Sequence, residues 1–168
     1  PGEMKLNTNT NLITWTPLTT DPLSNVVIVE ISDGQLTRTQ KWSIDLVISA
    51  PKIISFIAND PDDGDIVFSV DDTITINFDQ DTNMPAVSNL EEINTLLKFN
   101  EPIGSNYSGV WNTRSELVIT ILKVSGANPG IGSLRVQVNK AGNLLNSAET
   151  SNASASISDI LKGDWGLK

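Results

Sequence analysis

Apolar and polar residues alternate with a period of two along much of this chain, which predicts strands with one buried face. The clearest case is residues 73–78, where every second residue is apolar. Gly, Pro, Asp and Asn cluster between these segments, as turns between short strands require. We predict strands at residues 12–16, 26–31, 41–48, 53–57, 66–69, 73–78, 107–111, 116–122, 133–138 and 154–157. The predicted fold class is therefore all-β.

One segment departs from this pattern and predicts a short helix over residues 89–98. It begins with the capping box Ser88-Asn89-Leu90-Glu91. The apolar residues that follow have helical spacing and are Leu90, Ile93, Leu96 and Leu97. The helix interrupts the predicted series of strands once.

Pro51 marks a linker and divides the chain into residues 1–49 and 50–168. The first part contains three predicted strands, too few to close a β-sandwich. The second part contains about seven strands, as many as one complete sandwich of the immunoglobulin type requires. We therefore expect strands from outside this chain to complete residues 1–49.

Composition excludes several kinds of chemistry. The chain has 168 residues with no cysteine and no histidine, so it lacks disulfides, the Ser-His-Asp triad and zinc sites that use histidine. No segment approaches the roughly 20 apolar residues of a membrane span, and the first residues do not resemble a signal peptide. A cytoplasmic protein and an internal piece of a longer exported protein both fit. We favour the second, at the cell surface or outside the cell, with metal in place of disulfides.

The charge distribution adds the most specific information. Residues 53–97 hold ten Asp or Glu and no Lys or Arg, whereas the net charge of the whole chain is −9. Two carboxylates about 5 Å apart repel by roughly 3 kcal/mol at an effective dielectric constant near 20. Such a cluster requires compensation, and calcium accepts six to eight oxygen ligands of the kind found here. The negative charge also opposes nucleic-acid binding.

The first part resembles the second half of the cadherin-like Ig repeats found in bacterial and archaeal surface proteins and in dystroglycan. The resemblance covers about 45 residues and lies in Asn11-Leu12-Ile13-Thr14-Trp15-Thr16-Pro17 followed by Val26 to Gly34. Residues 72–78 are similar to a strand of the bacterial Ig-like domains of adhesins and surface layers. These resemblances imply tandem β-sandwiches, the first incomplete and the second with one short helix.

Residues 58–69 are similar to a calcium-binding pattern of cadherins. Asp60 and Asp62 match the two aspartates that bind calcium, Gly64 matches the turn glycine, and Asp65 stands where cadherins have Asn. The acidic cadherin linker is replaced upstream by Ser49-Ala50-Pro51-Lys52, so other ligands must come from elsewhere. The candidate calcium ligands are Asn59, Asp60, Asp62, Asp65, Asp79 and Asp81, with Asn83 as a further donor. Asp33, Asp71 and Asp72 are instead predicted to lie in solvated turns.

Three classes of function fit these observations. The first is a non-catalytic structural or adhesive module, stiffened by calcium, whose partners are neighbouring tandem domains or subunits in a fibre or surface lattice. The second is a calcium-dependent carbohydrate-binding module in which Trp111 or Trp165 stacks on a glycan. The third is a domain of a secreted hydrolase whose catalytic part lies elsewhere. Exposed tryptophans favour glycan binding, and buried tryptophans favour the structural module.

Overall fold

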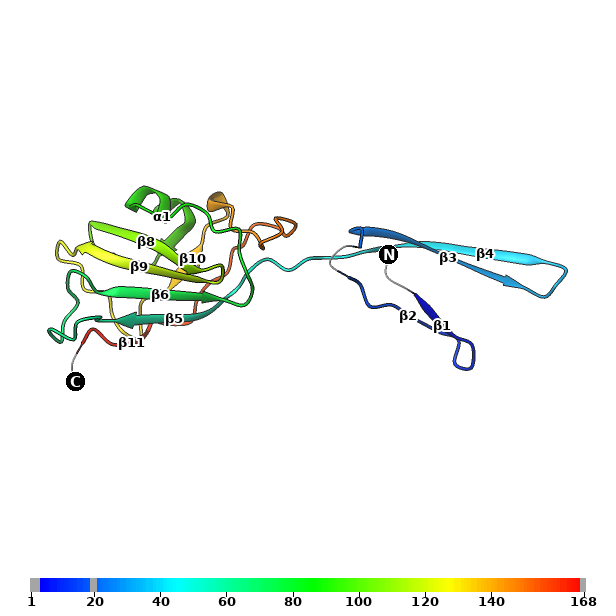
Figure 1. Cartoon of the computed structure of the whole chain (residues 1–168), viewed down its shortest axis with the longest axis horizontal. Helices are drawn as coiled ribbons and strands as arrows, with labels where there is room; N and C mark the ends of the chain where they lie inside the picture. Colours follow the sequence, from blue (N-terminus) through cyan, green and yellow to red (C-terminus); the bar gives the residue numbers. More distant parts are fainter. Residues whose placement is uncertain (1–3, 19–20, 167–168) are drawn as a thin grey trace. The chain divides into compact units, whose positions relative to one another are not determined.

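The computed structural model describes residues 4–18 and 21–166, and β-strands are the main regular structure of these residues, as predicted. Contacts divide the chain into two compact units, Pro1–Val47 and Ile48–Lys168. Figure 1 shows the strands of each unit. Within the described part of the chain, no helix is long and apolar enough to cross a membrane.

The first unit consists of two hairpins. β1 (Lys5–Asn7) pairs with β2 (Leu12–Thr14), and β3 (Ser24–Ser32) pairs with β4 (Thr37–Asp45), all antiparallel. The turn between β3 and β4 is held by Asp33, whose Oδ1 accepts hydrogen bonds from the backbone N–H groups of Gln35 and Leu36 at 2.9 and 2.8 Å. Asp33 is therefore a turn residue, as predicted.

Most apolar side chains of the first unit lie in solvent. Val27 is buried among the described residues of this unit, whereas the following large apolar residues are exposed: Leu6, Leu12, Ile13, Leu18, Leu23, Val26, Ile28, Ile31, Leu36, Trp42 and Val47. A two-stranded sheet without a covering layer is marginally stable in water. The unit therefore lacks most of the core that its own strands would support.

The second unit is built on a five-stranded sheet with the order β11-β5-β6-β9-β8. Its strands are β5 (Ile53–Asn59), β6 (Thr73–Phe78), β8 (Asn106–Thr113), β9 (Glu116–Lys123) and β11 (Lys162–Gly163). β11 runs parallel to β5, and the other neighbours are antiparallel. β6 and β9 lie in the middle of the sheet.

A second layer covers one face of this sheet. It contains α1 (Leu90–Leu96), η1 (Lys140–Gly142) and the antiparallel pair of β7 (Leu97–Phe99) and β10 (Val136–Val138), as Figure 1 shows for α1 and β10. Alternate residues of the central strands meet this layer. Ile74, Ile76, Leu117, Ile119 and Ile121 are fully buried. The apolar residues that recur with a period of two in the sequence therefore form the core.

The sequence prediction differs from the structure at several element boundaries. Residues 66–69 do not form a strand, and residues 154–157 contribute only an isolated bridge between Ile157 and Gln137. The helix ends at Leu96, because Leu97 is already extended and begins β7, which pairs with β10. Leu97, whose spacing suggested a longer helix, is buried as the first residue of β7.

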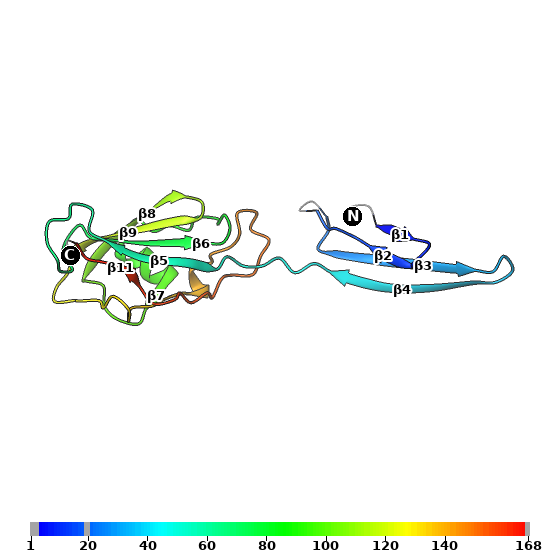
Figure 2. The same cartoon turned by 90° about the horizontal axis from the view of Figure 1, so that it is seen from below.

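The topology places two chain segments at one end of the sheet. β5 and β6 are antiparallel, so the connection between them lies where β5 ends. β11 is parallel to β5, with Lys162 opposite Ile57, and it therefore carries residues 162–166 toward the same end (Figure 2). The linker residues 48–52 lie at the other end of the sheet, where β5 begins.

We predict that the two units differ in hydrogen exchange. Amide protons of β3 and β4 should exchange at least about 100-fold faster than those of β6 and β9, because the hairpin has few buried contacts to lose when it opens. Exchange of the 168-residue chain followed by NMR measures this. Equal protection of residues 12–48 in a chain that sediments as a monomer would show that the first unit is self-sufficient.

Candidate metal site

The connection between β5 and β6, residues 60–72, is called the acidic loop below. Asn59 is exposed at the end of β5, Asp60 is half-buried, and Asp62 and Asp65 are exposed. Each of these three aspartates accepts a hydrogen bond from the backbone N–H two residues later, at 3.1, 2.9 and 2.8 Å respectively. In each case the acceptor is Oδ1, so the loop is folded around its own carboxylates.

Partial burial acts to raise the pKa of Asp60. A backbone and a side-chain hydrogen bond with Asp62, together with backbone hydrogen bonds from Asp65 and Asp63, outweigh that effect and hold the pKa below its ordinary value. Asp60 is therefore a carboxylate at neutral pH and available as an anionic ligand.

Asp79 and Asp81 lie at the other end of the sheet. The Asp79 N–H donates to the Lys52 carbonyl at 2.9 Å, and Asp79 Oδ1 accepts from the Lys52 N–H at 2.8 Å. The length of β6 separates them from the acidic loop, a distance on the order of 20 Å at 3.3 Å per residue. The structure therefore places Asn59, Asp60, Asp62 and Asp65 at one end of the sheet and Asp79 and Asp81 at the other, and the six residues do not form one ligand set.

The structure adds Asp72 to the acidic loop. Asp72 is 1% exposed, and its Oδ2 accepts a hydrogen bond from the Ser69 N–H at 2.7 Å. Its Oδ1 is buried and has no hydrogen-bond partner. The prediction of a solvated turn is wrong for this residue, although Asp71 beside it is exposed. Asp72 lies two residues before Ile74 and so extends the alternation of buried residues in β6. The same alternation in the sequence could have identified it as buried.

The charged side chains that affect the pKa of Asp72 are negative. Burial raises the pKa of Asp72 to about 6; the Ser69 N–H opposes the rise, and the negative charges of Asp60, Asp65 and Asp62 add to it. No cation among the described residues appears in this balance of effects. The loop therefore holds a buried carboxylate surrounded by like charges, which is unfavourable unless something compensates it.

The end of the chain closes over this loop. The Trp165 ring lies edge-on to Phe68 with centroids 4.8 Å apart, and its Nε1 donates to the Pro129 carbonyl at 3.1 Å. Gly166 follows with φ of +119°. The point where its Cβ would stand is 1.8 Å from the Asp65 carbonyl oxygen and 2.8 Å from Asp60 Oδ2. These two oxygens therefore converge beside Gly166, whose backbone packs so closely against them that a side chain at this position would clash.

Both tryptophans considered for glycan stacking take part in the fold. Trp165 is buried as described, and half-buried Trp111 donates from Nε1 to the Pro85 carbonyl at 2.8 Å while its ring lies 5.8 Å from that of Phe78. The indole N–H of each tryptophan is therefore bonded within the fold.

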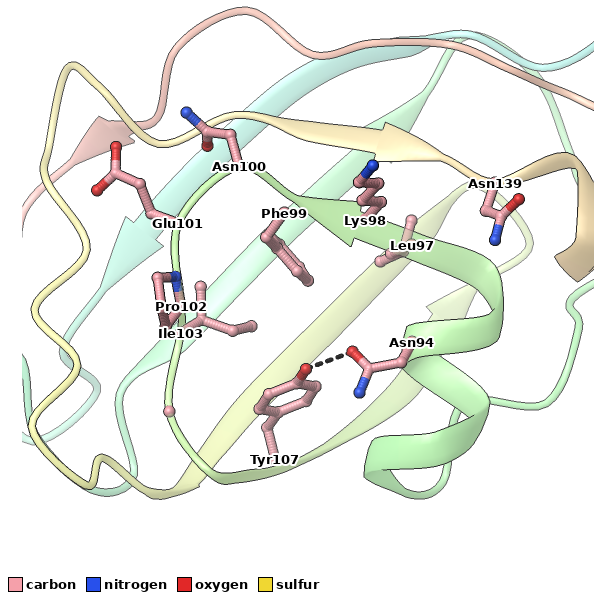
Figure 3. A pocket seen from close by; sticks show the side chains of 11 residues that line it. Asn94, Leu97, Lys98, Phe99, Asn100, Glu101, Pro102, Ile103, Tyr107 and Asn139 are labelled. Carbon is pink, nitrogen blue, oxygen red and sulfur yellow. Dashed lines mark hydrogen bonds between the residues drawn. The ribbon is translucent and has the colours of Figure 1, made fainter.

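A separate depression of about 510 Å³ lies between α1, β7 and the start of β8 (Figure 3). The Tyr107 hydroxyl donates to Asn94 Oδ1 inside it. Other polar groups of the lining serve the fold: Asn100 accepts from the Arg135 N–H, and Glu101 accepts from the Gly130 N–H. Glu101 is the acid of this lining, so the depression offers no pair of carboxylates for acid-base catalysis.

Comparison with protein-family models, curated proteins and solved structures finds no match to this chain. Within residues 4–18 and 21–166, no three side chains of His, Cys, Asp or Glu are already gathered as a metal-binding group. A site in the acidic loop must therefore include backbone oxygens or water beside its carboxylates, as calcium sites commonly do. The unpartnered Asp72 oxygen and the converging oxygens beside Gly166 fit such an ion.

We predict a pH-dependent loss of stability in metal-free buffer. The folded-state pKa of Asp72, about 6, is above its unfolded value near 3.8, so the folded protein binds the proton more tightly. The stabilisation from this proton is full below about pH 4 and is lost as the pH rises through 6. The melting temperature of the native chain relative to Asp72→Asn should fall over this range. Asp71→Asn serves as the control, and a difference that does not change with pH would contradict the assignment.

Proposed function

We propose that this chain is a non-catalytic structural or adhesive module of a cell-surface or extracellular protein, and that calcium stiffens its second unit. The observation that carries the calcium proposal is the carboxylate of Asp72, which is buried without a partner for Oδ1 and has Asp60, Asp62 and Asp65 as its charged neighbours. A hard divalent cation supplies the missing positive charge and accepts the carboxylate and carbonyl oxygens present there.

The position of the acidic loop changes the role expected for the ion. The sequence predicts that calcium stiffens the first loop of the second part against its neighbour. This loop lies at the end of the sheet reached by residues 162–166, away from linker residues 48–52. In a tandem array we therefore propose that the ion stiffens the exit of the second unit toward the neighbour that follows.

The first unit supports a role in assembly. Its apolar side chains are mostly exposed, and a strand or sheet from another part of a longer chain or from another subunit would give them a core. Tandem Ig-like or cadherin-like sandwiches would provide such strands. We propose that residues 1–49 are completed in this way, within a fibre or surface lattice.

The second candidate function is a calcium-dependent carbohydrate-binding module. Trp111 and Trp165 do not support it, because both are engaged in the fold. The observation that favours this candidate is the polar depression beside Tyr107, because asparagine side chains and an aromatic ring line the depression (Figure 3). Glycan-array binding that depends on calcium would favour this candidate over the structural module.

We predict that calcium raises the melting temperature of the second unit. At a hundredfold excess over its dissociation constant, calcium adds about 2.7 kcal/mol of stability, equivalent to a shift of several degrees. The double variant Asp60→Asn/Asp62→Asn should lose this shift, as measured by scanning calorimetry with calcium and with chelator.

The matched control removes two charges at the other end of the same sheet. Asp79→Asn/Asp81→Asn should retain the calcium-dependent shift, because these residues lie away from the acidic loop. The proposal fails if chelator leaves the melting temperature of the native chain unchanged, or if both double variants lose the shift equally.

A further inference from the structure

We propose that Asp72 is a direct ligand of a single calcium ion, which it binds through Oδ1 together with Asp60 Oδ2 and the main-chain carbonyl oxygen of Asp65. This inference rests on the proposed function, because it assigns the ligands of the ion that stiffens the second unit. It replaces the ligand set expected from the sequence, in which Asp79 and Asp81 completed the site and Asp72 had no part.

Asp72 is buried immediately before the start of β6. Its two carboxylate oxygens are in different situations: Oδ2 is satisfied by the Ser69 N–H at 2.7 Å, whereas Oδ1 is buried and has no partner. A buried polar atom without a partner is rare in a folded protein and indicates a missing ligand, ion or water. The hydrogen bond from Ser69 holds the carboxylate in place, so the position of Oδ1 is fixed as well.

Two more oxygens converge at the same end of the sheet. Asp65 O and Asp60 Oδ2 both lie within 2.8 Å of the point where a Cβ of residue 166 would stand. Asp60 Oδ1 accepts from the Asp62 N–H at 3.1 Å, and Oδ2 is the oxygen that lies beside Gly166. One carboxylate oxygen and one carbonyl oxygen are thus close enough to share an ion.

The strand register connects these groups. Asn59 pairs with Thr73, so Asp60 and Asp72 follow as neighbours on the two antiparallel strands at this end of the sheet. Asp62 is exposed and its Oδ1 accepts from the Gly64 N–H at 2.9 Å, so we place it outside the direct ligand set. Its charge contributes to attraction of the ion.

This ligand set has a definite chemical preference. Two carboxylates and a carbonyl leave several coordination positions for water, and the loop that carries Asp60 and Asp65 is free of regular structure. Calcium tolerates irregular geometry and six to eight oxygens, whereas magnesium requires a near-ideal octahedron. We therefore expect calcium in preference to magnesium, with a dissociation constant on the order of 10⁻⁴ to 10⁻³ M, as in extracellular calcium modules.

The same geometry couples the ion to the end of the chain. Gly166 rests on Asp65 O and Asp60 Oδ2, the two oxygens assigned to the ion, and Trp165 packs on Phe68 of the same loop. An ion that fixes these oxygens also fixes the surface against which residues 165 and 166 lie. The direction in which the chain leaves the second unit is then set by calcium.

The test compares single variants of the full 168-residue chain by calcium titration calorimetry. Asp72→Asn and Asp60→Asn should each weaken calcium binding at least tenfold, and the native chain should bind one ion in this site. The control is Asp71→Asn, which removes the same charge from the adjacent, exposed residue. Asp71 has φ of 75°, a conformation that asparagine adopts readily, and this variant should bind calcium like the native chain.

The outcomes separate this inference from the proposed function. If Asp60→Asn loses binding while folded Asp72→Asn keeps the native affinity, the acidic loop binds calcium without Asp72 and the inference is overturned. If the native chain does not bind calcium at millimolar concentration, both proposals fail. Equal weakening by Asp71→Asn and Asp72→Asn would show an effect of net charge alone and would also overturn the assignment.

A second measurement requires no variant and covers the case in which Asp72→Asn does not fold. Aspartate labelled with ¹³C at the carboxyl group reports direct ligation by NMR. Addition of calcium should shift the Asp72 and Asp60 carboxyl resonances and leave those of Asp71 and Asp79 in place. An unchanged Asp72 resonance at saturating calcium would contradict a direct role.

Discussion

The stability of the second unit depends on what compensates the buried carboxylate of Asp72. The residue lies at the entrance of β6, the strand whose alternate side chains fill the core, and it shares the buried phase of Ile74 and Ile76. Removing a carboxylate from water is unfavourable unless opposite charge or hydrogen bonds replace the solvent. Here one oxygen has a hydrogen bond and the nearby charges are negative. We propose that a bound cation resolves that conflict.

Much of the fold was predictable from the sequence, because it depends on local periodicity. The strand at residues 73–78 was predicted with its observed bounds, and the helix was located correctly except that its last turn became β7. β11 was missed, because a two-residue strand has no periodic signal and forms by pairing with distant β5. Residues 66–69 looked like a strand, but they have no partner strand in the described structure, and the loop folds around its own aspartates instead.

The candidate site was predictable only in part. The spacing of Asp60, Asp62 and Asp65 marked the acidic loop, whose local turns depend on neighbouring residues. The grouping with Asp79 and Asp81 could not be tested without the strand register, which places them at the other end of the sheet. Asp72 could have been included by extending the period of β6 backward by two residues. Gly166 could not, because it meets the loop only through the parallel pairing of β11.

The central claim is that a cation compensates the acidic end of the second unit, and crystallography with calcium tests it most directly. Crystals grown or soaked in calcium should show an anomalous peak at the ion. The ion should lie about 2.3 to 2.6 Å from Asp72 Oδ1, with Asp60 Oδ2 and the Asp65 carbonyl oxygen at similar distances. A well-ordered acidic loop at saturating calcium with no peak beside Asp72 would contradict this account of the protein.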